Sequence, residues 1–263
     1  MTPSTDHALA RALAEQAGRA LLEVRASAAS TGLAGKDLKD AGDARAQEVL
    51  AVLLAQHRPG DAVLSEEAAD SAARLSADRV WIIDPLDGTR EFSEPPRDDW
   101  AVHVALWERG SSDDGSLVAG AVALPARGVT YATDAAPVVP AKPEGPLRLA
   151  VSRTRPPSFV VALAEALGAE LVPMGSAGVK CASVWRGEAD AYVHGGGQYE
   201  WDSAAPVAVA RAAGLHTSRL DGAPLVYNRP DPKLPDLVVC RPDLATTLLT
   251  AIAAQLEQEV SAP

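Results

Sequence analysis

Residues 81–89 read Trp-Ile-Ile-Asp-Pro-Leu-Asp-Gly-Thr. The three apolar residues that begin this stretch predict a short buried strand. Pro85 cannot donate a backbone hydrogen bond and restricts its own φ angle, so we expect the chain to turn there. Such a turn lets the carboxylates of Asp84 and Asp87 and the backbone carbonyl of Leu86 face a common point.

These three oxygen groups predict a cation site. Two carboxylates held close together repel each other unless a cation lies between them. Carboxylate, carbonyl and water oxygens suit Mg²⁺, with Mn²⁺ or Ca²⁺ as substitutes. Gly88 and Thr89 follow, and their backbone N–H groups at an expected helix start favour an anion such as phosphate. The alternative at this point is a capped turn with two solvated aspartates, because Asp-Gly is a common turn sequence.

The composition is that of a soluble globular protein. The chain has 263 residues, of which 47% are hydrophobic and 22% charged, enough for one large domain or two small ones. No apolar run approaches the roughly 18 residues of a membrane helix, and the start lacks the basic segment of a signal peptide. We therefore expect a cytoplasmic protein that does not bind membranes.

The net charge of -11 argues against binding to a nucleic acid polymer. An acidic protein that acts on an anionic substrate needs a local positive charge, and a bound divalent metal supplies one. Cys181 and Cys240 lie in apolar settings without a C-x-x-C pair, which predicts buried, reduced thiols. The five histidines show no zinc spacing. His103 is expected to be a packed strand residue rather than a ligand.

The first half predicts two helices followed by strands. Apolar spacing places the helices at residues 7–26 and 44–57, and the glycine-rich, charged segment 31–43 between them predicts a loop. The strand at 62–64 leads directly into Glu66, just as the later strand leads into Asp84. Strands that end at one sheet edge bring such residues together. Further strands are expected at residues 100–107, 117–124 and 129–132, the last two as a hairpin.

The second half predicts an alternation of strands and helices. Four prolines at 137–146 indicate a junction between domains 1–138 and 139–263. The helix start at Gly175, with Lys180 in its first turns, is a second possible anion site. Asp202 fits a helix N-cap, and capping alone explains an aspartate there. The expected strands are 147–151, 171–174, 189–193 and 236–240, and the expected helices are 158–167, one from 175, 200–214 and 243–258.

Four segments together resemble the inositol monophosphatase family of metal-dependent, lithium-sensitive phosphatases. They are Ser65-Glu66-Glu67, WIIDPLDGT (81–89), GSAGVK (175–180) and EWDSAAP (200–206). Their order and spacing are similar to the family over nearly the whole chain, and residues 84–99 and 200–214 look most similar to its CysQ-type branch. The resemblance implies an α+β or α/β fold built as a layered αβαβα sandwich. It also implies Mg²⁺-dependent removal of the 3'-phosphate of 3'-phosphoadenosine 5'-phosphate (PAP), and of its sulfated form PAPS, to give AMP in the first case, in sulfate assimilation.

The resemblance also implies a metal-ligand set. Glu66, Asp84 and the Leu86 carbonyl would hold one Mg²⁺, and Asp84, Asp87 and Asp202 would hold the second. Two such metals would activate a water for attack on phosphorus and stabilise the leaving oxygen. Mn²⁺ would substitute, whereas Li⁺ and Ca²⁺ would inhibit.

Further roles follow from the same resemblance. Gly88 and Thr89 would bind phosphate through their amides, and Thr89 would orient the attacking water with help from Asp43. The catalytic residues would thus be Glu66, Asp43 and Thr89. The segment 36–43 resembles a mobile loop that brings in a third metal, although Asp40 stands where the family commonly has threonine and Ser65 where it has glycine. A homodimer is a further expectation. The other contacts to the small phosphorylated substrate, expected to be a nucleotide, would come from Ser152, Arg153, Gly175, Ser176 and Lys180.

Other functions fit parts of the pattern. Inositol monophosphatase or fructose-1,6-bisphosphatase activity would use the same mechanism on another substrate. A haloacid-dehalogenase-like phosphatase is disfavoured because its aspartates lie two residues apart, whereas Asp84 and Asp87 lie three apart. A non-catalytic nucleotide-binding regulator is the alternative of another class, and the intact set of acidic residues argues against it.

Overall fold

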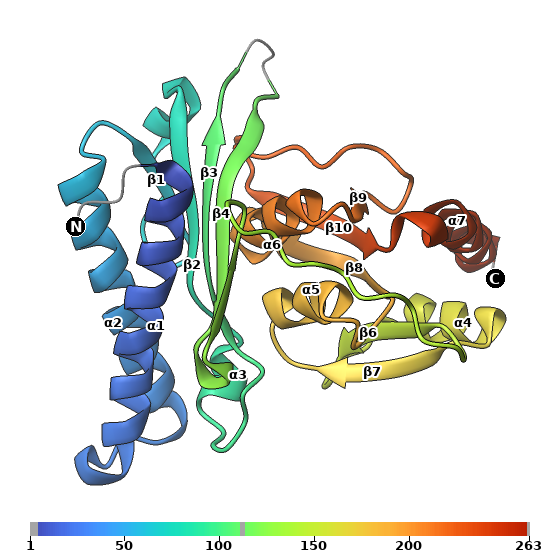
Figure 1. Ribbon diagram of the computed structural model, residues 1–263, viewed down its shortest axis with the longest axis horizontal. Coiled ribbons are helices and arrows are strands. Elements are labelled where there is room, and N and C mark those ends of the chain that lie inside the picture. The colour runs from blue at the N-terminus through green and yellow to red at the C-terminus, as the bar shows by residue number, and fades with distance from the viewer. Residues whose placement is uncertain (1–4, 111–113, 262–263) are drawn as a thin grey trace.

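The computed structural model describes residues 5–110 and 114–261 (Figure 1). Its helices are α1 (Asp6–Thr31), α2 (Gly35–His57), α3 (Thr89–Phe92), α4 (Ser158–Leu167), α5 (Ala177–Trp185), α6 (Glu200–Ala212) and α7 (Ala245–Ser261). Short 3₁₀ helices lie at η1 (Ala72–Ser76), η2 (Pro125–Arg127) and η3 (Pro242–Leu244). The strands are β1 (Ala62–Ser65), β2 (Arg79–Asp87), β3 (Ala101–Glu108), β4 (Ser116–Leu124), β5 (Val129–Ala132), β6 (Arg148–Ser152), β7 (Glu170–Met174), β8 (Ala191–Tyr199), β9 (His216–Ser218) and β10 (Lys233–Cys240).

The strands form two sheets, with the orders β1-β2-β3-β4-β5 and β7-β6-β8-β10-β9. β1 runs parallel to β2, and β6 runs parallel to β7 and β8, whereas the other pairs are antiparallel. Helices α1 and α2 cover one face of the first sheet, α5 and α6 lie between the sheets, and α4 and α7 cover the far face of the second (Figure 1). This arrangement confirms the expected αβαβα sandwich.

β2 is buried on both faces, which explains its unbroken apolar run. Trp81 and Ile83 face α1 and α2, whereas Val80 and Ile82 face α6, and all four side chains are fully buried. On the next strands, Gly120 of β4 lets α6 approach closely: a Cβ at this glycine would lie 2.7 Å from the Ala208 Cβ. The strand that carries the two aspartates is therefore fixed between two packed layers.

The loop expected at 31–43 is wrong, because most of it is helical. α1 continues to Thr31, a single left-handed residue, Gly32, ends it with φ 73°, and α2 begins at Gly35. Lys36 forms an ion pair with Asp40 one helical turn later, and Leu38 is buried against the core. These contacts explain why a polar, glycine-containing segment is a helix.

The two sheets are joined by the segment between β5 and β6. The expected domain boundary between residues 138 and 139 falls within this segment. It stays a prediction, because α5 and α6 share one hydrophobic core with both sheets and the structure does not separate two domains there. Cys181 and Cys240 are free and buried, as expected. Within the described residues, every helix is too short or too polar to cross a membrane.

Candidate active site

An irregularity in β2 places the two aspartates of the motif. Asp84 pairs with His103 and Asp87 pairs with Ala101, so the two intervening residues bulge out of the ladder. The Asp84 carboxylate accepts a hydrogen bond from the Leu86 amide at 3.0 Å. The strand thus continues through Pro85 instead of ending before it, and the bulge brings both carboxylates to one side.

Glu66 reaches the same place because β1 runs parallel to β2. Ser65, the last residue of β1, pairs with Ile83, and the Glu66 amide lies 3.4 Å from the Ile83 carbonyl oxygen. Glu66 as a whole residue is exposed, but its carboxyl group lies close enough to Asp84 that its charge raises the pKa of Asp84. Two strands that are adjacent and parallel therefore deliver Glu66 and Asp84 side by side.

Asp202 comes from α6, on the other side of the site. Asp202 is not the N-cap expected from the sequence: Tyr199 holds that position, and Asp202, the third residue of the helix, accepts the Tyr199 amide at 2.6 Å with one oxygen. One carboxylate oxygen from each of Asp84, Asp87 and Asp202 lies within 4.8 Å of the others. The capping role and the proximity to the aspartate pair coexist, since a carboxylate has two oxygens.

Asp87 is the best-satisfied member of the group. Its two oxygens accept hydrogen bonds from the Ala177 amide at 3.1 Å, the Gly178 amide at 2.7 Å and the Ser176 hydroxyl, all at the start of α5. His103 Nε2 lies 3.2 Å from Asp87 Oδ2. A carboxylate of the first sheet therefore caps a helix that packs between the sheets.

The electrostatics separate Asp87 from the other acids. Burial opposes its charge, but His103, Lys180 and the Ser176 hydroxyl lower the pKa of Asp87 well below its usual value. Burial and the charges of Glu66 and Asp87 raise the pKa of Asp84 well above its usual value. Burial and the neighbouring acids raise the pKa of Asp202 to about 6 and that of Glu66 to about 7. Carboxylates without enough cations around them are a donor set that fits a divalent metal.

Gly88 and Thr89 lie directly beyond the bulge. Gly88 has φ 88°, and a Cβ there would lie 3.2 Å from the Asp99 carbonyl oxygen and from the Ser176 Cβ. Thr89 begins α3 and donates its hydroxyl to the Leu86 carbonyl at 3.2 Å. Asp43 lies on α2, where burial and the charges of Glu67 and Asp40 raise the pKa of Asp43 to about 7. Its described hydrogen bonds do not include Thr89, so the structure does not join these two residues directly.

A cavity of about 520 Å³ opens beside the acids. Its lining combines Glu66, Asp87 and Asp202 with residues of the second sheet. A smaller cavity of about 240 Å³ adjoins it. The smaller one is lined by Gly88, Thr89, Arg90, Glu91, Ser152, Arg153, Thr154, Arg155, Met174, Gly175, Ser176 and Lys180. The structure therefore brings the expected substrate-contacting residues to cavities next to the acidic cluster.

The cations at these cavities differ in availability. Lys180 is buried, donates to the Ser176 carbonyl at 2.7 Å and lies 5.3 Å from the Tyr192 ring centroid. Burial lowers the pKa of Lys180. Arg153 already pairs with Glu91 at 2.7 Å and Glu94 at 3.0 Å. Both cations would have to share or exchange these partners to contact a phosphate.

Two residues with a place in this site were missed from the sequence. His103 is fully buried as expected, but its Nδ1 donates to the Trp201 carbonyl at 3.1 Å while its other nitrogen faces Asp87. Arg155 is exposed, lines both cavities and forms no side-chain ion pair within the described residues. The place of His103 could be predicted only with knowledge of how β2 pairs with β3. Arg155 lies in a polar turn that has no distinctive sequence pattern.

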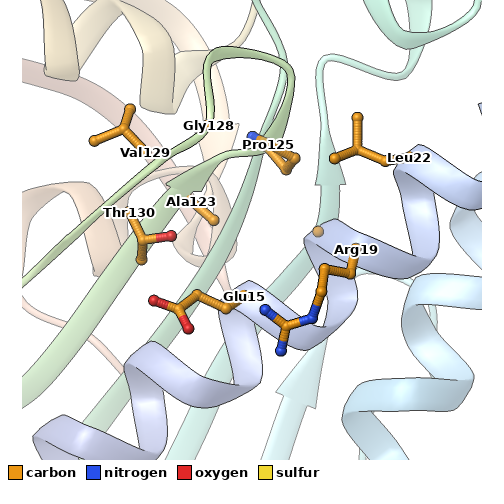
Figure 2. A pocket seen from close by; sticks show the side chains of 9 residues that line it. Glu15, Arg19, Leu22, Ala123, Pro125, Gly128, Val129 and Thr130 are labelled. Atoms are coloured by element: carbon orange, nitrogen blue, oxygen red, sulfur yellow. The ribbon is translucent and has the colours of Figure 1, made fainter.

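Another cavity lies between α1 and the β4–β5 hairpin, and none of the acids of the site lines it. Figure 2 shows Glu15 and Arg19 of the helix facing Pro125 and Thr130 of the hairpin. Its volume is about 260 Å³, and it contains none of the expected site residues. The chemistry suggested by the sequence therefore lies in the cavity beside Asp202.

The fold and this acidic site define the class of protein. Residues 3–260 match the model of the inositol monophosphatase family, and the chain belongs to that family. It is similar to the 3'-phosphoadenosine 5'-phosphate phosphatase of Mycobacterium tuberculosis (strain CDC 1551 / Oshkosh), with 55% identity over 90% of this chain and 89% of the relative. It is 32% identical to the 3'(2'),5'-bisphosphate nucleotidase CysQ of Escherichia coli O157:H7, over 82% of this chain and 91% of that one. Among solved structures, CysQ from Bacteroides thetaiotaomicron, a bacterial member of the same family, superposes with a TM-score of 0.73 and 26% identity, over 89% of this chain and 96% of that one.

Proposed function

We propose that this protein is a Mg²⁺-dependent phosphomonoesterase that removes the 3'-phosphate of PAP to give AMP. The observation that carries the proposal is the convergence of Asp84, Asp87 and Asp202 beside Glu66. The names of the mycobacterial and Escherichia coli relatives support a nucleotide substrate with a 3'-phosphate. PAPS is proposed as a second substrate of the same site.

The acidic residues would hold the metals. We assign Glu66, Asp84 and the Leu86 carbonyl to one Mg²⁺, and Asp84, Asp87 and Asp202 to the other. Bound metal lowers the pKa of a water molecule and stabilises the leaving oxygen. The same oxygen set would accept Mn²⁺, whereas Ca²⁺, which prefers more ligands at longer distances, is expected to inhibit. Li⁺ is expected to inhibit as well.

The remaining residues would position the phosphate and the water. The amides of Gly88 and Thr89 lie at a helix start and would donate to phosphate oxygens. Thr89 donates its hydroxyl hydrogen to Leu86, so its oxygen can accept a hydrogen bond from the attacking water. We assign Asp43 and Glu66 to the activation of that water, with Asp43 acting after a local adjustment of α2 or α3.

Direct attack by water requires no covalent intermediate. The described cavity lining contains Ser152 and Ser176, but the Ser176 hydroxyl is bonded to Asp87, and within the described residues neither serine forms a hydrogen bond with a histidine. The free thiol Cys181 is buried, and burial raises its pKa. An activated protein nucleophile is therefore disfavoured.

The test is phosphate release in Mg²⁺ from PAP, inositol 1-phosphate and fructose 1,6-bisphosphate. We expect the highest kcat/KM for PAP. Asp87→Asn should lose more activity than the roughly 10- to 100-fold typical of residues that only support a metal ligand. Asp243→Asn, at an exposed aspartate, is the matched control and should behave as wild type.

Three results would change the proposal. Equal rates for wild type and Asp87→Asn would remove the metal role of Asp87. A higher kcat/KM for inositol 1-phosphate would move the activity to another substrate. Nucleotide binding without Mg²⁺ binding, measured by calorimetry, would favour the non-catalytic regulator. We also propose a cytoplasmic location and a homodimer, the latter testable by light scattering.

A further inference from the structure

Tyr199 presents an exposed aromatic ring at the cavity that holds the acids. Its side chain is 47% exposed although it is large and apolar. The ring stacks on Trp201, with 4.6 Å between the ring centroids and 6° between the planes, and both residues line the cavity with Asp202. A ring fixed in this way is a rigid surface on which a planar ligand can stack.

Gln198 supplies a second, independent observation. It lines the same cavity but is only 8% exposed, and its Nε2 has no hydrogen-bond partner within the described residues. A buried donor without a partner is unfavourable, and such groups in a folded protein need an explanation. An acceptor atom of a ligand in the cavity would satisfy it.

The part of β8 that directly precedes these two residues leaves room for a flat group. Gly196 and Gly197 have φ angles of 113° and 89°, and a Cβ at Gly196 would meet no heavy atom within 4 Å. The cavity volume of about 520 Å³ lies within the range of sites for small organic ligands. The acids line one part of this cavity, so a ligand that places its phosphate there has space for a ring beside Tyr199.

We propose that Tyr199 and Gln198 bind the purine base of the substrate, an inference that rests on the nucleotide phosphatase function proposed above. Tyr199 stacks on the ring, and Gln198 donates its amide N–H to a ring nitrogen. A glutamine amide matches the donor and acceptor edge of adenine. The base contacts thus select a nucleotide over a phosphorylated sugar or polyol that lacks a base.

Calorimetry of AMP and of ribose 5-phosphate, both in Mg²⁺, separates base binding from phosphate binding. Tyr199→Ala should weaken AMP binding by about 10-fold or more and leave ribose 5-phosphate binding unchanged. Tyr199→Phe keeps the ring and should retain AMP binding. Gln198→Met keeps the side-chain length, removes the donor and should weaken AMP binding alone.

Equal losses for AMP and ribose 5-phosphate in Tyr199→Ala would show a structural role and overturn the inference. It would also be overturned if wild type bound AMP no more tightly than ribose 5-phosphate. Should Tyr199→Ala not fold, Tyr199→Leu gives the same comparison. A wild-type protein that binds AMP through Tyr199 but releases no phosphate from PAP would contradict only the proposed function.

Discussion

Two aspartates of one motif are expected to have opposite effects on the stability of the metal-free protein. Asp84 is buried, accepts one protein hydrogen bond and faces other acids. At 4.8 Å, the separation within which the three carboxylate oxygens lie, one pair of like charges costs about 3 kcal/mol at an effective dielectric of 20. Asp84→Asn removes this repulsion and should raise the free energy of unfolding by about 1 to 3 kcal/mol.

Asp87→Asn should have the reverse effect. The amide that replaces one oxygen would point a donor at the donors of α5, which costs about 1 to 3 kcal/mol for the unpaired group. Loss of the negative charge at the start of that helix removes a further 0.3 to 1 kcal/mol, roughly. Little repulsion is relieved in return, because His103, Lys180 and the Ser176 hydroxyl already stabilise the charge of Asp87 and lower its pKa well below the usual value.

Urea unfolding in EDTA, followed by tryptophan fluorescence, measures both effects through the midpoint at constant slope. The gain from Asp84→Asn should be present near neutral pH and vanish as the pH falls below about 4, where an aspartate becomes protonated in the unfolded state as well as in the folded one. Saturating Mg²⁺, at 100 times its dissociation constant, should stabilise wild type by about 2.7 kcal/mol and neither variant to this extent. The reasoning fails if Asp84→Asn destabilises the metal-free protein or if Asp87→Asn does not.

Three further predictions follow from other contacts of the site. The pKa of Glu66 is raised to about 7 and that of Asp202 to about 6, so Mg²⁺ binding should weaken as the pH falls from 7 to 6 and should release protons. Calorimetric titrations with Mg²⁺ in two buffers of different ionisation enthalpy measure this release. Equal heats of binding in the two buffers would contradict the prediction. Gly178→Ala places a Cβ 2.1 Å from Nε2 of the buried His103 and should lower both the free energy of unfolding and the Mg²⁺ affinity. Gly60→Ala is the control and should change neither, because a Cβ at Gly60 would meet no heavy atom within 4 Å. Arg74→Ala removes the donor for the buried Asn228 side chain and for the Arg229 carbonyl, together with an ion pair to the exposed Asp70. It should lower the free energy of unfolding by about 2 to 4 kcal/mol, and an unchanged urea midpoint would contradict this.

The meeting of Glu66 and Asp84 could be inferred from a local pattern, whereas the layered fold and the place of Asp202 were inferred from the resemblance to the family. A strand followed by an acid occurs twice, and parallel pairing of β1 with β2 joins the two acids. Segment 31–43 misled because glycine and charge indicate a loop, whereas Leu38 and the pair of Lys36 with Asp40 favour a helix. The role of His103 was out of reach, since alternation gives burial but not the strand register that sets it opposite Asp84.

Contacts that involve no metal ligand hold the acids together against their repulsion. Arg74, buried on η1 after Glu66, donates to the Asn228 side chain at 2.7 Å and to the Arg229 carbonyl at 2.9 Å. Glu200 accepts the amides of these same two residues at 2.6 and 2.8 Å, and Glu200 begins α6 two positions before Asp202. The segment after Glu66 is therefore tied to the helix that carries Asp202 through Asn228 and Arg229. Because these links include none of the proposed metal ligands, we expect the four acids to stay in place before any metal binds, so that metal affinity is not spent on assembling the ligands.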